Sequence, residues 1–330
     1  MKGSEVIKYI VKSIIPEMGY SLHKGSMGRI CVFGGSEEYT GAPYYSAISS
    51  LRIGCDLSTV VCTPSASIPI KSYSPELIVY PYLGDTLSSR FSGERNNVFV
   101  VGPGLGRSDN NVLNGVMDFS FAEKHVVFDG DGIFLLCSFP FEKISKCLEN
   151  SFSCVITPNA NEFIRLKSRF LPDYTSRESP DDSKETMDLC KEIGKKLGGK
   201  INVVLVRKGF RDIITDGKLS ISVGINNPSP RRCGGQGDVL SGSLGTFLFW
   251  AGLATKKSVF PWIGGDIVSN VLMSCVGACL VVKKSSSLAF CKKKRGTVTP
   301  DIIECIVDAF DFTFSEKNNE DDFEELIQFN

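Results

Sequence analysis

The sequence is poor in histidine and has no excess of charge of either sign. Only two of its 330 residues are histidine, His23 and His125, so a Ser-His-Asp triad or a histidine-rich metal site is not expected. Lys and Arg number 37, and so do Asp and Glu, which leaves a formal net charge of zero. Without a basic excess, no overall field attracts nucleic acid or an anionic membrane surface. We therefore expect small-molecule partners, with no nucleic acid and no membrane.

The twelve cysteines lack the spacing of a metal or redox site, because the sequence contains no C-x-x-C pair. Cys31, Cys62 and Cys154 lie in apolar runs typical of strands, whereas Cys275 and Cys279 lie in a helical pattern. Such cysteines behave as small hydrophobic side chains, and free thiols persist in reducing compartments. We predict free thiols and a cytoplasmic location, with a mitochondrial pool left open.

Apolar runs as long as the roughly 18 residues of a membrane span are also missing. Near the amino terminus, arginine is absent and Glu5 is present, which argues against a mitochondrial presequence. Apolar residues recur there at helical spacing and predict an amphipathic first helix that packs on the domain. These residues are Val6, Ile7, Ile10, Val11, Ile14 and Ile15.

Apolar runs typical of buried strands alternate with helical patterns through most of the chain, with helices expected at about Pro43–Gly54 and Asn110–Glu123. This order predicts an α/β fold with a central, mostly parallel sheet covered by helices on both faces. We expect one domain over residues 1–314, an exposed loop at Lys167–Ser183 and a frayed acidic tail over residues 315–330. The expected strands are Arg29–Phe33, Ser58–Cys62, Leu77–Tyr80, Asn97–Val101, Val126–Asp129, Cys154–Thr157 and Val203–Arg207.

The segment Gly234-Gly235-Gln236-Gly237-Asp238 precedes an apolar helical stretch. Glycines let a backbone approach a ligand closely, and a helix start presents free N–H groups to an anion. A carboxylate beside such an anion site suits a base that takes a proton from an attacking hydroxyl group. The alternative is that Asp238 only caps its helix, since Asp is a favoured N-cap residue.

Other glycine-rich motifs do not fit this chain. The sequence contains no G-x-x-x-x-G-K-[ST], and Gly102–Gly106 does not match G-x-G-x-x-G. Polar groups nevertheless follow the expected strands at Asp129–Gly132, Thr157–Glu162 and Lys208–Gly209. Because the carboxyl ends of parallel strands converge on one crevice, we expect these groups to meet.

Several motifs in order make the chain, from about Lys24 to Asp301, similar to the ATP-dependent NAD(P)H-hydrate dehydratases, the eukaryotic branch of the ribokinase-like superfamily. One departure is Gly130, where family members usually carry alanine. The motifs are His23–Gly25 with Gly28-Arg29, Gly34–Ser36 with Glu38–Pro43, Gly102–Arg107, Asp129–Gly132, Thr157–Asn159 with Glu162-Phe163, Lys208-Gly209, and Ser229 with Arg231–Asp238.

The resemblance implies a role for each of these segments. It implies Asp238 as the catalytic base, facing the substrate, and Mg²⁺ organised indirectly by Asn159 and Glu162. It implies that the hydrated dinucleotide contacts Ala42, Gly104, Gly106, Asn159, Ala160, Asn161, Glu162, Phe163, Ile164 and Arg165. It implies that ATP contacts Lys208, Gly209, Phe210, Arg211, Asp212, Pro228, Ser229, Pro230, Arg231, Arg232, Cys233, Gly234, Gly235, Gln236 and Gly237.

The activity so implied is ATP-dependent dehydration of hydrated NADH and NADPH, with transient phosphorylation of the C6 hydroxyl group and elimination of phosphate. It also implies functional partnership with an NAD(P)H-hydrate epimerase, and a homo-oligomer stays open. Two alternatives remain. One is a ribokinase-like small-molecule kinase that releases a phosphorylated product, and the other is a non-catalytic nucleotide-binding protein on the same fold.

Overall fold

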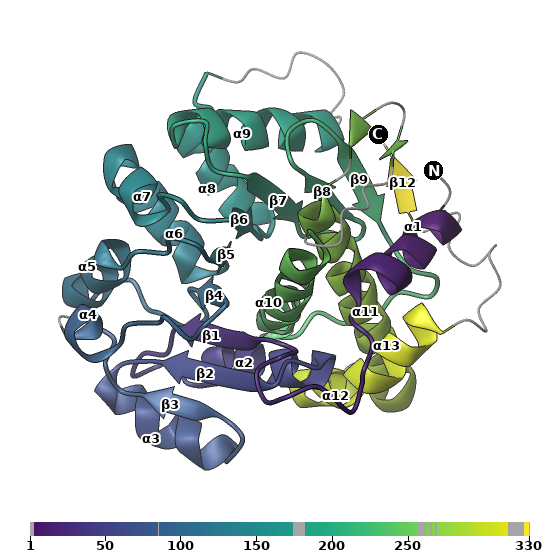
Figure 1. Cartoon of the computed structure of the whole chain (residues 1–330), viewed down its shortest axis with the longest axis horizontal. Helices are drawn as coiled ribbons and strands as arrows, with labels where there is room; N and C mark the ends of the chain where they lie inside the picture. Colours follow the sequence, from purple (N-terminus) through teal and green to yellow (C-terminus); the bar gives the residue numbers. More distant parts are fainter. Residues whose placement is uncertain are drawn as a thin grey trace.

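A ten-stranded β-sheet with helices on both faces forms the centre of the computed structural model (Figure 1). The strands run in the order β12-β9-β8-β7-β6-β5-β4-β1-β2-β3. The structure describes residues 3–84, 86–173, 182–255, 262–263, 266–267, 269–315 and 327–329. The strands are β1 Arg29–Phe33, β2 Leu57–Val61, β3 Ile78–Tyr80, β4 Val98–Val101, β5 His125–Phe128, β6 Ser153–Ile156, β7 Val203–Arg207, β8 Asp212–Thr215, β9 Ser220–Val223 and β12 Ile327–Phe329.

The first seven strands pair in parallel, whereas β8, β9 and β12 add an antiparallel extension at one edge. The predicted mostly parallel sheet is therefore confirmed, and its seven expected strands lie within one residue of the observed bounds. After β1 the chain continues to β2 and β3 on one side, and then crosses to β4 on the other side. Open α/β sheets bind ligands outside the carboxyl ends of the strands at such a reversal.

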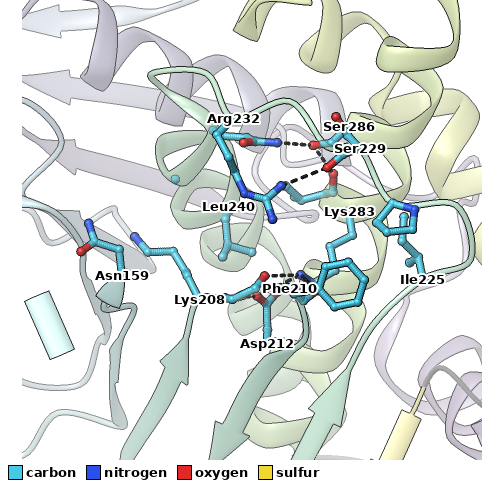
Figure 2. A pocket seen from close by; sticks show the side chains of 15 residues that line it. Asn159, Lys208, Phe210, Asp212, Ile225, Ser229, Arg232, Leu240, Lys283 and Ser286 are labelled. Atoms are coloured by element: carbon cyan, nitrogen blue, oxygen red, sulfur yellow. Dashed lines mark hydrogen bonds and ion pairs between the residues drawn. The ribbon is translucent and has the colours of Figure 1, made fainter. Parts of the chain in front are cut away.

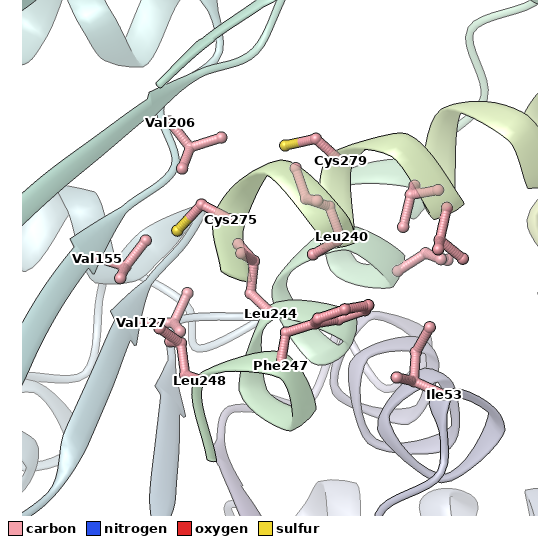
Figure 3. Packing of buried hydrophobic residues seen from close by; sticks show 14 of the residues in the cluster. Ile53, Val127, Val155, Val206, Leu240, Leu244, Phe247, Leu248, Cys275 and Cys279 are labelled. Atoms are coloured by element: carbon pink, nitrogen blue, oxygen red, sulfur yellow. The ribbon is translucent and has the colours of Figure 1, made fainter. Parts of the chain in front are cut away.

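One face of the sheet packs on a cluster of mainly aliphatic side chains from the amino- and carboxyl-terminal helices. Val127 and Val155 of the sheet point toward Leu244 of α10 and Cys275 of α11 (Figure 3). Burial of this kind, at roughly 25 cal/mol per Å² of apolar surface, holds α10 on the sheet. The helices on this face are α1 Gly3–Tyr9, α2 Gly41–Ile53, α3 Pro64–Tyr73, α10 Gln236–Thr255, α11 Asn270–Lys293, α12 Thr299–Glu304 and α13 Ile306–Phe314.

The opposite face packs on a second cluster, in which Phe33, Phe99, Phe119 and Phe121 form a group of edge-to-face and tilted rings. Alternate residues of β1, β2, β4, β5, β6 and β7 supply the two clusters, as the two-residue period of a strand requires. The helices on this face are α4 Leu87–Arg90, α5 Asn110–Asp118, α6 Asp131–Ser138, α7 Phe141–Cys147, α8 Ala160–Phe170 and α9 Asp182–Lys196. The short elements η1 Ile10–Ile14, η2 Lys294–Gly296, β10 Trp262–Ile263 and β11 Asp266–Ile267 complete the described structure.

The predicted first helix and free thiols are confirmed. Val6 and Ile10 are fully buried in α1 and η1, and Ile14 is 2% exposed. All twelve cysteines are free, and nine of them are buried. The helix from Asn270 to Gly296 is long and apolar enough to cross a membrane, but 83% of its apolar window is buried inside the protein. The helical pattern expected around Cys275 and Cys279 is therefore confirmed, the length of the helix was not foreseen, and its burial is that of a core helix.

Three expected boundaries were wrong. The predicted loop Lys167–Ser183 begins inside α8, which continues to the fully buried Phe170, and its last two residues open α9. Residues 174–181 lie outside the described residues. The second expected helix ends at Asp118, not at Glu123.

The carboxyl-terminal segment is not frayed throughout. Ile327–Phe329 form β12, which pairs antiparallel with β9, and Ile327 is 3% exposed. Residues 316–326 lie outside the described residues. The acidic composition of the segment concealed this short apolar strand, which belongs to the sheet.

Candidate functional site

Two glycine loops meet where the strand order reverses, at the carboxyl ends of β1 and β4. The Gly35 N–H group donates hydrogen bonds to the carbonyl oxygens of Pro103 and Gly104, each over 3.1 Å. A Cβ atom on Gly34 would lie 2.0 Å from the carbonyl oxygen of Pro103. Only glycine permits this contact, which fixes the two loops against each other.

Asp131, at the start of α6, joins the next strand end to the same place. Its Oδ2 accepts a hydrogen bond from the Gly106 N–H group at 3.0 Å, and its Oδ1 lies 2.6 Å from Nε of Arg107. A Cβ atom on Gly102 would lie 1.9 Å from the carbonyl oxygen of Asp129. The carboxyl ends of β1, β4 and β5 therefore form one continuous surface.

The end of β7 brings a cation to this surface. Nζ of Lys208 lies 2.7 Å from Oδ1 of Asp129 and 3.8 Å from Oε2 of Glu162. Thr157, at the end of β6, donates a second hydrogen bond of 2.7 Å to Oδ1 of Asp129. Charged groups taken out of water need partners of this kind. The three polar strand ends singled out in the sequence thus form one buried cluster.

The glycine loop before α10 completes the cluster. The helix begins at Gln236, two residues before Asp238, so the alternative that Asp238 is the N-cap residue is wrong. Gly235 has a φ of +93°, a conformation that favours glycine. A Cβ atom on Gly237 would lie 3.2 Å from Nζ of Lys208. The free N–H groups of the first helical turn and the lysine ammonium therefore face the same space.

Asp238 is a half-buried carboxylate within this space. Burial raises its pKa well above the usual range, and the negative charges of Asp129, Asp131 and Glu162 raise it further, against the lowering effect of Lys208. A raised pKa makes a carboxylate a stronger base, closer to the working pH of an enzyme. No hydrogen bond or ion pair to this carboxylate is found in the described part of the chain, which suits a group that awaits a substrate proton.

Lys208 keeps its charge in the same environment. Burial alone would lower the pKa of its ammonium group, but Asp129, Glu162 and Asp238 reverse the effect and raise the pKa. Burial raises the pKa of Glu162, which Lys208 lowers in part. A charged lysine and the N–H groups of a helix start form a site for phosphate oxygens.

A cavity of about 420 Å³ opens beside this cluster (Figure 2). Ile225, Leu240 and Val282 give it an apolar wall, a composition usual for small-molecule sites. Arg232, which donates a 3.1 Å hydrogen bond to the carbonyl oxygen of Ser229, lies across it from Lys208. The cavity therefore combines an apolar surface with cationic groups, as a purine nucleotide requires.

Comparison with known proteins identifies the family. The family model described as NAD(P)H-hydrate dehydratase matches residues 30–308. The chain belongs to the NAD(P)H-hydrate dehydratase family. It is 41% identical to the ATP-dependent (S)-NAD(P)H-hydrate dehydratase of Vitis vinifera, over 90% of this chain and 84% of that protein. It is 40% identical to the human protein of that name, over 95% and 86%, and 38% identical to that of Entamoeba histolytica, over 96% and 97%.

Solved structures agree with the fold of this dehydratase family. The ADP/ATP-dependent NAD(P)H-hydrate dehydratase of Bacillus subtilis, co-crystallised with ATP and Mg²⁺, aligns with a TM-score of 0.66 at 15% identity, over 92% of this chain and 96% of that one. A hypothetical protein of Streptococcus mutans aligns at 0.69 and 19% identity, over 94% and 99%. A ribokinase-like protein of Enterococcus faecalis aligns at 0.64. The fold is therefore ribokinase-like, as expected.

The residues predicted to contact ATP divide into two groups. One group lines the cavity: Lys208, Gly209, Phe210, Asp212, Pro228, Ser229, Arg232, Gln236 and Gly237. The others lie around it and contact the protein. Arg211 donates to Oγ of Ser222, Arg231 to the carbonyl oxygen of Thr297, and Cys233 contacts Thr299. Gly234 accepts a hydrogen bond from Thr299, Gly235 packs on Tyr45, and Pro230 is exposed.

The residues expected to contact the dinucleotide are divided, because Asn159 lines the same cavity as Lys208, whereas Ala42, Gly104 and Gly106 are not among the residues that line it. A Cβ atom on Gly104 would lie 3.3 Å from that of Ala42, so the two predicted contacts are neighbours. Burial, followed by the charges of neighbouring groups that include Asp238, raises the pKa of Tyr45. Tyr45 in α2 thus connects the Ala42 region with the loop of Asp238. Gly106 adjoins Ser36, and its backbone is held by Asp131.

The segment from Asn159 to Arg165 combines exposed and buried side chains. Ala160, Asn161 and Ile164 are exposed, and Arg165 is half-buried. Phe163, however, is only 2% exposed and its ring lies 4.0 Å below the Arg207 guanidinium. Its side chain therefore belongs to the core, and its contact with the dinucleotide stays a prediction that only its backbone could fulfil.

Asn159 and Glu162 form a capping box at the start of α8. Oδ1 of Asn159 accepts hydrogen bonds from the N–H groups of Asn161 and Glu162, and Oε2 of Glu162 accepts one from the Asn159 N–H group at 2.8 Å. These oxygens are occupied, and no cluster of three or more acidic, histidine or cysteine ligands occurs within the described ranges. With these oxygens engaged in the capping box, the role of Asn159 and Glu162 toward Mg²⁺ would be indirect, and that role stays a prediction.

Three residues of the candidate site received no role in the sequence analysis. Asp129 and Asp131 were noticed at a strand end but received no role. Lys283, in the apolar helix α11, lines the cavity, lies 3.0 Å from Oδ1 of Asp212, and donates to the carbonyl oxygens of Gly209 and Phe210. A lysine inside an otherwise apolar helical stretch was the signal that could have marked it.

Proposed function

We propose that this chain catalyses the ATP-dependent dehydration of hydrated NADH and NADPH, with Asp238 as the base. The observation that carries the proposal is the position of Asp238. Its carboxylate lies at the start of α10, beside the nucleotide-sized cavity and near the Ala42 and Gly104 loops. A base between two substrate sites can take a proton from the hydroxyl group of one substrate while the oxygen of that group attacks the other substrate.

The proposed reaction converts a poor leaving group, hydroxide, into a good one, phosphate. Hydroxide leaves poorly from C6 of the hydrated ring, so we propose that Asp238 takes the proton of that hydroxyl group while its oxygen attacks the terminal phosphorus of ATP. ADP leaves and a C6 phosphate ester forms. The ring nitrogen then supplies an electron pair as the C6–O bond breaks and phosphate leaves. Loss of a proton from C5 restores the C5–C6 double bond.

The protein supplies the charge stabilisation that phosphoryl transfer needs. The ammonium group of Lys208 and the N–H groups of the first turn of α10 face the same space and would bind the terminal phosphate oxygens. Arg232, across the cavity, would meet the other phosphates or the sugar. Such fixed donors stabilise developing charge without reorganisation during the reaction.

Mg²⁺ would enter as part of the ATP complex. Three carboxylates, Asp129, Asp131 and Glu162, raise the pKa of Asp238 and so mark a negative local potential. Mg²⁺ prefers oxygen ligands, keeps several waters and is held largely by substrate phosphates. We propose that Asn159 and Glu162 act on such a complex only through water or through Lys208.

The cellular setting is also a proposal. The names of the relatives specify the (S) form of the hydrate. An epimerase that interconverts the two hydrate forms would therefore supply the substrate, and it is the functional partner that we expect. The free cysteines support a reducing compartment, and we propose the cytoplasm, with a mitochondrial pool and a homo-oligomer as further possibilities to test.

A coupled optical assay tests the function. Purified protein is mixed with hydrated NADH or NADPH, MgCl₂ and either ATP or ADP, and the absorbance of the reduced nicotinamide is followed. We expect its return with ATP and release of equal amounts of ADP and phosphate. A stable phosphorylated product without recovered NADH would contradict the proposal and indicate a kinase.

A further inference from the structure

Asp129 is a carboxylate that the fold buries almost completely, at 2% exposure. Fully buried aspartates are rare unless they are paired. Here Oδ1 receives two close contacts, from the ammonium group of Lys208 and from the hydroxyl group of Thr157, each at 2.7 Å. The residue therefore connects the ends of β5, β6 and β7.

The second oxygen of Asp129 reaches toward α10. A Cβ atom on Gly237 would lie 3.7 Å from Oδ2 of Asp129 and 3.2 Å from Nζ of Lys208. The ion pair thus adjoins the first turn of the helix, at the N–H groups that would receive a phosphate. A side chain in place of Gly237 would stand in the way of this approach.

Glu162 cannot easily replace Asp129 as the partner of Lys208. Its Oε2 lies 3.8 Å from Nζ, beyond hydrogen-bond distance, and already accepts the Asn159 N–H group at 2.8 Å. Within the described ranges these two carboxylates are the ion-pair partners of Lys208. The position of the ammonium group thus depends mainly on Asp129.

We propose that Asp129 is a positioning residue of the dehydratase reaction, which holds the Lys208 ammonium group at the first turn of α10, where it meets the terminal phosphates of ATP. The proposal rests on the proposed function, because it assigns Lys208 to that nucleotide. Asp129 itself touches neither substrate. It acts through Lys208, because a flexible lysine without a fixed partner populates several rotamers. The ammonium group would then no longer be held at the first turn of α10.

The same carboxylate has a second, separable effect. The charged groups that act on Asp238 are Asp129 at the end of β5, Asp131 in α6, Glu162 in α8 and Lys208 at the end of β7. Tyr45 of α2 adjoins Asp238 as well. Removal of the Asp129 charge should lower the pKa of Asp238 and move the acidic limb of the pH–rate profile to lower pH. A purely structural residue would not produce that shift.

The experiment compares Asp129→Asn with Asp131→Asn. Both remove one negative charge near Asp238, but Asp131 pairs with Arg107 and Gly106 and not with Lys208. ATP affinity is measured by calorimetry without hydrate, and KM and kcat are measured across pH with hydrate present. We expect Asp129→Asn to raise the Kd and the KM for ATP by about ten- to hundredfold, the worth of a charge-assisted hydrogen bond. Asp131→Asn should shift the pH limb and leave the Kd for ATP unchanged.

Two further variants separate charge from position. Asp129→Glu keeps the charge but lengthens the side chain, so it should restore the pH limb and leave the KM for ATP raised. Thr157→Val removes one hydrogen bond to Asp129 and disturbs the fold less. It should raise the KM for ATP by about two- to fivefold, and this milder variant decides the question if Asp129→Asn does not fold.

An unchanged Kd for ATP in folded Asp129→Asn or in Thr157→Val would overturn the proposal. Equal effects of Asp129→Asn and Asp131→Asn on ATP affinity would overturn it as well, because Lys208 would then not be the mediator. The calorimetric measurement needs no turnover of hydrate. A wild-type protein that binds ATP but recovers no NADH would therefore refute the proposed function alone.

Discussion

Strand β5 has a buried ionisable side chain at each end, and the two side chains differ in the charged groups that surround them. His125 opens the strand, 8% exposed, with Nδ1 at 2.8 Å from Oγ of Ser153. Asp129 directly follows the strand and pairs with Lys208. Burial lowers the pKa of His125 to about 4. At the amino end burial acts without a counter-charge, whereas at the carboxyl end five charged groups gather.

The comparison separates a buried polar residue that serves the fold from buried polar residues that serve the proposed reaction. His125 is buried in its neutral form and contributes to the fold. At the other end, burial and like charges raise the pKa of Asp238, so keeping that carboxylate ionised opposes folding. Enzymes accept such costs where chemistry needs them. The two ends therefore make opposite contributions to stability as the pH changes.

The largest expected effect belongs to Asp238→Asn. Loss of the base should reduce kcat by roughly two to four orders of magnitude, while ATP binding measured by calorimetry persists. A raised pKa means that the ionised form of Asp238 destabilises the fold at neutral pH, so the variant should also unfold at a higher temperature. Near-normal turnover would remove Asp238 from its proposed role.

At the amino end, His125→Gln tests stability. The folded protein resists protonation of His125, so the free energy of unfolding should fall as the pH drops from about 6.5 to about 4, by roughly 3 kcal/mol. His125→Gln should abolish this part of the acid dependence in urea titrations and leave kcat unchanged. His23→Gln is the matched control, because His23 is exposed. An equal change in both variants would contradict the assignment.

Two glycines of α10 extend the comparison to backbone positions. A Cβ atom on Gly237 would lie 3.2 Å from Nζ of Lys208, and one on Gly252 would lie 3.1 Å from Nε2 of His125. We expect Gly237→Ala to raise the KM for ATP by about three- to tenfold, because the ammonium group must shift by tenths of an ångström. Gly252→Ala should leave the KM unchanged and alter only the melting temperature. The reverse pattern would refute the division between the two ends.

The smallest expected effect is that of Lys283→Met. Lys283 ties α11 to the loop from Gly209 to Asp212 through two carbonyl oxygens and one carboxylate. Without it, the loop that carries Phe210 is held less firmly, and the KM for ATP should rise by about two- to fivefold at constant kcat. Lys284→Met, whose ammonium group lies 3.5 Å over the Phe312 ring, is the control. A lower kcat with unchanged KM would exclude this role.

The sequence was informative where structure is local. Runs such as Arg29–Phe33 are apolar throughout because both faces of a parallel strand are buried, and they predicted the central strands well. The antiparallel strands β8 and β9 are only four residues long and each contains two polar residues, so they were not predicted. The short strand β12 was hidden by the acidic residues before it.

The candidate site shows the same limit. Asp238 could be predicted because its glycines and its helix adjoin it in the sequence. Asp129 was expected to lie near Lys208 at the converging strand ends, but its role could not be predicted, because the two residues lie 79 positions apart and no local pattern records which atoms pair. The burial of Phe163 could not be predicted for the converse reason, since a residue next to a polar motif can face the core. Which side chains pair across a fold depends on the topology and not on the neighbouring sequence.

The position of β12 has a consequence for biosynthesis. The strand pairs with β9, and helices α10, α11, α12 and α13 all separate the two in the chain. While the ribosome is still making those helices, the outer edge of β9 has no neighbour and offers its peptide groups to any other nascent chain. Unpaired edges of this kind promote aggregation. A premature stop just before Ile327 should therefore lower the solubility of the protein, an effect that would be apparent before its activity is measured.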